Sequence, residues 1–157
     1  MTPAELITRK LKQAIESAGA TVPVISLLLE ALEGEKHETG SSFIAITVQV
    51  SEQLEESIPH YRFEVSVAIV AAIDDDKSGG LFKTNHDAIW SVFDNFARGD
   101  NCTALGDEGD ELAGGAAHIF AVDGFQLGAG NAPTFTDDEH GGSWSTSFAA
   151  TITGRAN

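Results

Sequence analysis

Residues 43–50 read FIAITVQV, and residues 61–69 read YRFEVSVAI. In the first stretch every second residue from Ile44 to Val50 is apolar, and in the second every second residue from Tyr61 to Ile69 is apolar. Apolar residues with a period of two are typical of strands in a half-buried antiparallel sheet. The two stretches therefore predict paired strands, connected by a loop over residues 51–60.

Two amphipathic helices are predicted on either side of this pair. Residues 2–19 begin with a capping signal, because Thr2 can cap the helix, Pro3 suits its first position and Glu5 completes a capping box. Apolar residues then recur at helical spacing until a glycine at position 19. Residues 84–96 carry a second apolar stripe, for which Thr84 is the expected cap and Asp87 a first-turn acid.

Two more strands are predicted, over residues 116–127 and 143–153. In the last stretch one face is expected to carry Trp144, Thr146, Phe148, Ala150 and Ile152. Residues 22–32 are mostly apolar and fit either a helix or a strand. The fold class that follows is α+β, an antiparallel or mixed sheet of about four strands packed against two main helices. We expect a single domain over residues 1–157, with mobile loops near 51–60, 99–115 and 128–142.

The charge is strongly acidic, with a formal net charge of −15 in 157 residues. No Lys or Arg lies between Arg98 and Arg155. Such a chain is a poor partner for a nucleic-acid backbone or an anionic membrane surface, because both require basic residues. The acidity serves either solubility or a surface that repels polyanions. The single Cys102 excludes an internal disulfide, and the N-terminal residues lack a signal-peptide pattern, so we expect a cytoplasmic site of synthesis.

Motifs for catalysis are not recognisable. Ser143 does not lie in a G-x-S-x-G frame, and the glycine-rich residues 124–131 lack the Lys-Ser/Thr of a phosphate-binding loop. Cys102 is interpreted as a bystander rather than a nucleophile. The histidines show no metal-ligand spacing; they are His37, His60, His86, His118 and His140. We therefore expect a structural or binding protein that is not an enzyme, with no cofactor and no metal site.

Residues 74–85 imitate the first half of a calcium-binding loop. Asp74, Asp76 and Ser78 supply oxygens at alternate positions, and a glycine follows at position 79. The twelfth position is Asn85 instead of the bidentate glutamate that such loops require. We expect an acidic turn between a strand and a helix, without tight calcium binding.

The order helix, paired strands, helix, paired strands resembles the tail terminator (tail completion) proteins of long-tailed bacteriophages. The likeness rests on the helix at 2–19, the strand pair at 43–48 and 61–67 followed by a Trp-containing helix, and the tryptophan-led final strand at 144–153. It covers most of the chain and is one of pattern. Residues 22–32 and 99–115 depart from it.

The resemblance implies a structural virion protein that assembles as a homohexameric ring on the tail tube. Such a ring stops tube polymerisation, joins the tail to head-completion (connector) proteins and lets DNA pass, at the head-proximal end of the tail. Assembly would take place in the host cytoplasm, with no membrane partner. Acidic residues on a glycine-flanked loop are the candidates for lining the lumen; they are Asp107, Glu108, Asp110 and Glu111.

Two other functions remain open. One is a small acidic cytoplasmic binding module, acting as a DNA mimic or as a chaperone-like protein without catalysis. The other, less supported, is a metal-dependent enzyme that uses the acidic loops. Oligomeric state separates the terminator from the DNA mimic, because a terminator forms a ring whereas a mimic captures a basic partner as a monomer.

Overall fold

The computed structural model describes residues 1–36, 40–55, 60–76, 80–106, 120–138 and 141–156. Its helices are α1 (Pro3–Ser17), α2 (Leu27–Glu33) and α3 (Leu81–Phe96), with short 3-10 turns η1 (Ile73–Asp75) and η2 (Asn101–Leu105). Its strands are β1 (Val24–Ile25), β2 (Phe43–Glu55), β3 (His60–Ala72), β4 (Phe120–Leu127), β5 (Thr134–Asp138) and β6 (Gly141–Ala156).

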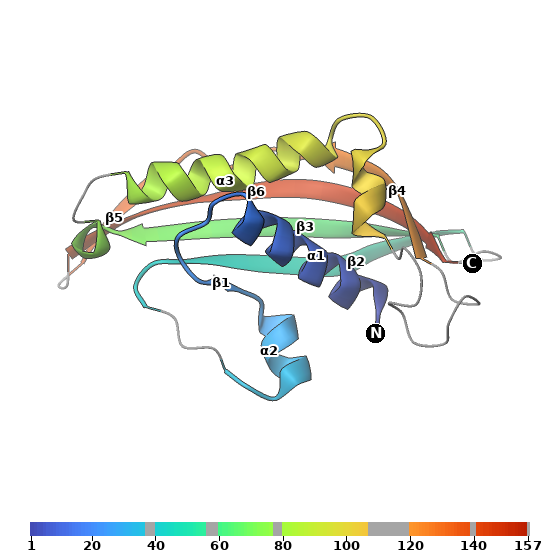
Figure 1. Cartoon of the computed structure of the whole chain (residues 1–157), viewed down its shortest axis with the longest axis horizontal. Helices are drawn as coiled ribbons and strands as arrows, with labels where there is room; N and C mark the ends of the chain where they lie inside the picture. The colour runs from blue at the N-terminus through green and yellow to red at the C-terminus, as the bar shows by residue number, and fades with distance from the viewer. Residues whose placement is uncertain (37–39, 56–59, 77–79, 107–119, 139–140, 157) are drawn as a thin grey trace.

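The strands form one six-stranded mixed sheet in the order β1-β2-β3-β6-β4, with β5 also paired to β6. Only β1 runs parallel to its neighbour β2, and the other pairs are antiparallel. Two strands pair with one edge of the long β6: β5 pairs with its residues Gly141–Ser145, and β4 pairs with its residues Ala150–Ala156. Strands β3 and β6 therefore form the centre of the sheet (Figure 1).

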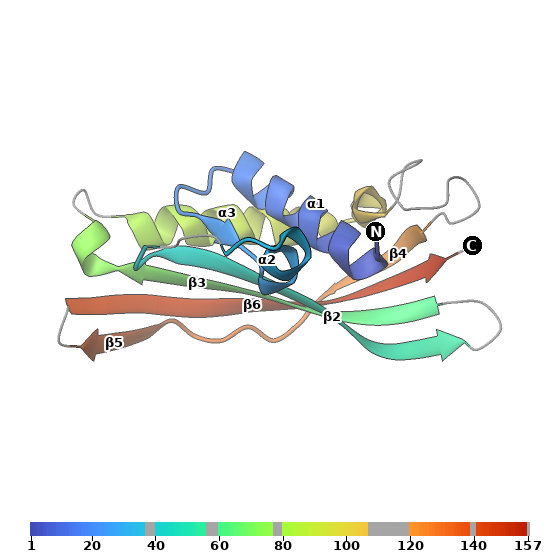
Figure 2. The ribbon, with the colours of Figure 1, turned by 90° about the horizontal axis from the view of Figure 1, so that it is seen from below.

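The helices cover one face of this sheet (Figure 2). Helix α1 packs on β2, α3 packs on β3 and β6, and the two helices contact each other. Between them and the sheet lies a single apolar core, whose largest fully buried side chains include Phe63, Phe93 and Phe120. No described helix lies on the opposite face of the sheet, so the domain has two layers.

The sequence correctly predicts the α+β class, the antiparallel pair β2–β3 and helix α1. Thr2 caps α1, since its Oγ1 accepts a hydrogen bond from the backbone N–H of Glu5 at 3.2 Å. The sheet has six strands instead of about four, because β1 and β5 are short. Residues 22–32 contain both alternatives, the short β1 followed by α2, and Ser26 caps α2 by accepting from the N–H of Leu29.

The predicted loops contain regular structure where the structure describes them. Strand β2 continues to Glu55, η2 lies within 99–115, and β5 lies within 128–142. The remainder of the loop predictions, and residues 116–119 of the predicted strand, lie outside the described residues. Strand β2 is longer than predicted because its pairing with β3 continues after Val50, through two register shifts.

The start of α3 corrects a second prediction. The helix begins at Leu81 rather than at Thr84, after Gly80 in the left-handed region at a φ of 97°. Asp76 takes the capping role, because its Oδ1 accepts from the N–H of Leu81 at 3.2 Å. Asp87 consequently lies beyond the first turn, where it pairs with Lys83. No described helix is long and apolar enough to span a membrane.

Candidate functional site

The outer flank of α3 and the β5–β6 hairpin carry a cluster of exposed aromatic side chains. Trp90, Phe135 and Trp144 are 47%, 42% and 43% exposed, whereas most other aromatic residues are in the core or packed against it. We use the name aromatic strip for Phe82, His86, Trp90, Phe135 and Trp144. Exposed aromatic groups gathered in one place are typical of binding surfaces, because isolated domains usually bury them.

Helix α3 builds one half of the strip. Phe82, His86 and Trp90 follow one another at intervals of four residues, so they share one flank of the helix. The ring of His86 lies between its neighbours, 5.6 Å from the Phe82 ring and 5.0 Å from the Phe148 ring of β6. These contacts place this flank over β6, and Ser91 and Asn95 on the other flank lie near α1.

The hairpin builds the other half. Phe135 of β5 pairs with Trp144 of β6, and their ring centroids are 5.0 Å apart. Trp144 also reaches the Phe82 ring, at 6.4 Å, and this contact joins the two halves. Gly142 makes room for the cluster, because a Cβ there would lie 2.2 Å from the Phe135 ring. Figure 1 shows β5 and the start of α3 at the end of the molecule remote from the C-terminus.

Carboxylates border the strip. Asp74 lies beside the hairpin, with its Oδ2 about 3.0 Å from the position that a Cβ on Gly141 would occupy. Asp137 follows Phe135 by two residues, so the two side chains leave β5 on the same face. Asp87 accepts a hydrogen bond from Lys83 at 2.5 Å, and chiefly this bond holds the pKa of Asp87 below its usual value. The border is therefore mainly anionic.

The helix-free face of the sheet has a different chemistry. Its side chains are small or carry hydroxyl groups along β6 and the centre of β3; they are Ser66, Ala68, Ser145, Ser147, Ala149 and Thr151. The segment before β5 is bonded to β6 here, since Asn131 Nδ2 donates to Ser147 Oγ at 2.6 Å. A groove of about 530 Å³ lies beside it, with Ala68, Val70, Ala132 and Thr134 among its walls.

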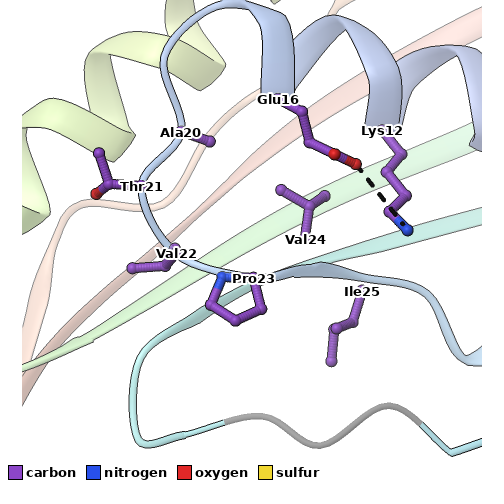
Figure 3. A pocket seen from close by; sticks show the side chains of 8 residues that line it. All are labelled: Lys12, Glu16, Ala20, Thr21, Val22, Pro23, Val24 and Ile25. Atoms are coloured by element: carbon purple, nitrogen blue, oxygen red, sulfur yellow. Dashed lines mark ion pairs between the residues drawn. The ribbon is translucent and has the colours of Figure 1, made fainter.

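A second groove, of about 540 Å³, lies between the end of α1 and the turn into β1 (Figure 3). Its wall carries the Lys12–Glu16 pair, whose charged atoms are 4.0 Å apart. The buried Asn85 of α3 stabilises this turn through hydrogen bonds to Thr21. Asn85 Oδ1 accepts from the N–H of Thr21 at 2.8 Å, while its Nδ2 donates to Thr21 Oγ1 and to the carbonyl of Leu81.

The calcium-like stretch is described only in part, because Ser78 and Gly79 lie outside the described residues. Asn85, its twelfth position, points at Thr21 and not at the aspartates. Of the expected ligands, Asp76 accepts a hydrogen bond from the N–H of Leu81 at 3.2 Å. The intervening Asp75 accepts from Ser42 Oγ at 2.6 Å. Among the described residues no group of three or more His, Cys, Asp or Glu side chains is arranged to hold a metal ion.

The other candidates are dispersed. Cys102 is buried, and burial raises the pKa of its thiol, which disfavours the nucleophilic thiolate. His60, the first residue of β3, pairs with Arg155 and lies 3.4 Å from Asp123. His86 is on α3 and contacts Phe148, seven residues along β6 from Arg155. His37, His118 and His140 lie outside the described residues. So do all four lumen candidates, Asp107, Glu108, Asp110 and Glu111.

Sequence reasoning missed the aromatic strip. The sequence patterns predict Trp90 in the apolar stripe of the second helix, Trp144 on one face of the last strand together with Phe148 and Ile152, and Phe135 in a loop. Trp144 shares a face of β6 with Thr146 and Phe148 and contacts Phe82 at the start of α3, yet it remains exposed. The spacing of Phe82, His86 and Trp90 is the signal that could have shown a second apolar flank.

Comparisons with known proteins add only distant structural likenesses. No protein-family model matches the sequence. No curated protein matches it either. One similar solved chain is described as "Virion of native gene transfer agent (GTA) particle", with 12% identity, a TM-score of 0.43 and coverage of 92% of each chain. Another, whose name states no function, has 12% identity, a TM-score of 0.46 and coverage of 98% of this chain and 94% of its own. Likenesses this weak carry no argument about function.

Proposed function

We propose that this protein is a structural component of a phage-like virion, a tail terminator that forms a ring on the tail tube. In this role it ends polymerisation of the tube, joins it to the head-completion proteins and leaves a passage for DNA. It acts through surfaces, without a catalytic step.

The observation that carries the proposal is the order of elements. An opening helix, the β2–β3 pair, the tryptophan-containing α3 and the tryptophan-led β6 follow one another as in the family that the sequence resembles. The two layers add support, because no described helix covers the second face of the sheet, which could therefore contact a neighbour in an assembly. A contact that joins different surfaces of identical chains closes into a ring when its rotation allows.

The net charge of −15 fits a passage for DNA, since anionic walls do not hold a polyanion. In this proposal Asp107, Glu108, Asp110 and Glu111 line the lumen. Bringing such residues together around an axis costs repulsion, which salt screens over about 8–10 Å at ordinary ionic strength. We therefore expect ring closure to strengthen as salt concentration rises, or to need the tail tube as a template.

The test is made on particles and on the purified protein. Particles assembled without the protein should carry tails of irregular, excessive length that fail to join heads, and supplying the intact protein should restore them. Electron microscopy of normal particles should show a six-fold ring at the head-proximal tip of the tail. If purified particles do not contain the protein, the terminator assignment is wrong.

The same net charge favours a second candidate, an acidic binding module that mimics DNA or holds a basic client. Among the described residues, at least five Lys or Arg side chains lie within 4.0 Å of a carboxylate; they are Arg9, Lys12, Arg62, Lys83 and Arg98. Native mass spectrometry over a range of salt separates the candidates. A hexamer favours the terminator, and a monomer that binds DNA-binding proteins in competition with DNA favours the mimic.

A further inference from the structure

We infer that the aromatic strip is a docking surface for a basic segment of another protein, one that presents Arg or Lys side chains together with apolar anchors. The strip shares no residue with the lumen candidates or with the helix-free face of the sheet. The inference does not depend on the terminator assignment.

The first argument is the chemistry of the strip itself. Trp90 and Trp144 are both about half exposed, although either ring could contribute to a core. Phe135 and Phe82 hold Trp144 between them, with ring centroids at 5.0 Å and 6.4 Å, so the exposed ring is fixed in position. A fixed, exposed tryptophan loses little conformational entropy on binding and is among the most frequent anchors of protein interfaces.

The second argument is the charge around the strip. Residues 73–87 and 134–146 supply four of its five members. The charged side chains that the structure describes in these two ranges are five aspartates against one lysine, namely Asp74, Asp75, Asp76, Asp87 and Asp137 against Lys83. The described lysine, Lys83, is paired with Asp87. Aromatic faces attract cations, and carboxylates at the border add to that attraction for an Arg or Lys side chain. An acidic or neutral partner lacks this second contribution.

The charge of the chain disfavours a second copy of itself as the occupant. The chain has 9 basic residues against 24 acidic ones, and the basic residues near the described surface are largely committed to internal ion pairs. Two copies that meet at the strip would bring their anionic borders together. A different, basic protein is therefore the occupant that the charges select.

The experiment uses the two tryptophans as reporters, because the protein has no others and both belong to the strip. The probe is a synthetic peptide that alternates arginine and leucine, titrated into the intact protein while tryptophan emission is recorded. We expect saturable binding with a change in emission. A matched peptide with glutamate in place of arginine should not bind.

Variants separate the strip from general attraction between opposite charges. Phe135→Ser keeps both reporters and should weaken peptide binding by about tenfold, the loss typical of an interface anchor. Trp90→Ala, read through Trp144, is a second variant with the same expected direction. Leu27→Ser is the matched control, since Leu27 is 77% exposed on α2, and it should leave the affinity unchanged.

Two outcomes would overturn the inference. One is equal affinity of the peptide for the wild type, Phe135→Ser and Trp90→Ala, which would mean that charge alone attracts it. The other is the absence of saturable binding to the wild-type protein. Oxidative footprinting of purified particles adds an independent reading, in which Trp90 and Trp144 should be protected relative to the free protein. Absence from the particles contradicts only the terminator, whereas presence with both tryptophans unprotected contradicts the docking surface.

Discussion

Side chains of the thirteen-residue central strand β3 point alternately to the two faces of the sheet, and the two sets of side chains have different environments. Phe63, Val65 and Val67 are buried beneath α1 and α3, while Glu64 and Ser66 between them face solvent. The period-two pattern thus separates two tasks within one strand. One face stabilises the domain, and the other is free to change or to bind without affecting the core.

The largest expected effect comes from placing the same charge on each face. Val67→Lys buries an unpaired ammonium group in the core and should prevent folding, since domains are stable by only about 5–15 kcal/mol. Ser66→Lys, one residue earlier, should change the free energy of unfolding by less than about 0.5 kcal/mol. Chemical denaturation followed by circular dichroism measures both. Similar stability of the two variants would remove the distinction between the faces.

A core cavity should come next in size. Phe93 is almost fully buried and contacts the rings of Phe125 and Phe148. Phe93→Ala should lower the free energy of unfolding by about 3–5 kcal/mol, because the cavity cannot fill by small movements. Phe148→Ala should cost less, as Phe148 is only half-buried. The melting temperatures decide, and an unchanged value for Phe93→Ala would show that the core is assigned wrongly.

The link between α3 and the turn into β1 should have an intermediate effect. Asn85→Ala removes the acceptor for the Thr21 N–H inside the helix-covered layer, and should cost about 1–3 kcal/mol. Thr84→Ala, an exposed neighbour on the same helix, is the control and should be close to neutral. Hydrogen exchange at Thr21 reports the bond directly. If exchange there is equally slow in both variants, Asn85 does not hold the turn.

The smallest effect concerns a pair outside both faces. Since Lys83 lowers the pKa of Asp87, this carboxylate adds stability above its unfolded pKa, and the contribution is lost as pH falls through the folded pKa. Lys83→Gln should return the pKa of Asp87 toward its usual value, which an NMR titration would detect. The pair is solvent-exposed, so we expect almost no shift in melting temperature at neutral pH. A pKa that stays depressed in this variant would contradict the assignment of the cause.

The helix-covered face of the sheet is predictable from the sequence, whereas the aromatic strip is not. The residues that pack against the helices recur at periods that sequence reasoning detects, as in β2, β3 and α1. Strand β5 is not predicted because it has only five residues and lies in a Gly-, Asn- and Asp-containing stretch. Its formation depends on pairing with β6 rather than on its own strand propensity. The aromatic strip combines residues more than fifty positions apart, whose proximity only the tertiary fold establishes.

The pairing of β3 with β6 has a consequence for how the chain reaches this structure. The nearest paired residues, Ala72 and Ser143, are separated by about seventy positions, although these strands form the centre of the sheet. Until β6 has been synthesised, β3 has an unpaired edge, and β2–β3 is a hairpin of the kind that is marginally stable alone. Closing so long a loop before its contacts form slows folding. We therefore expect the docking of β6 to be the slow, rate-limiting step of folding. Before that step the unpaired edge and the apolar side chains of β3 are exposed and can promote aggregation.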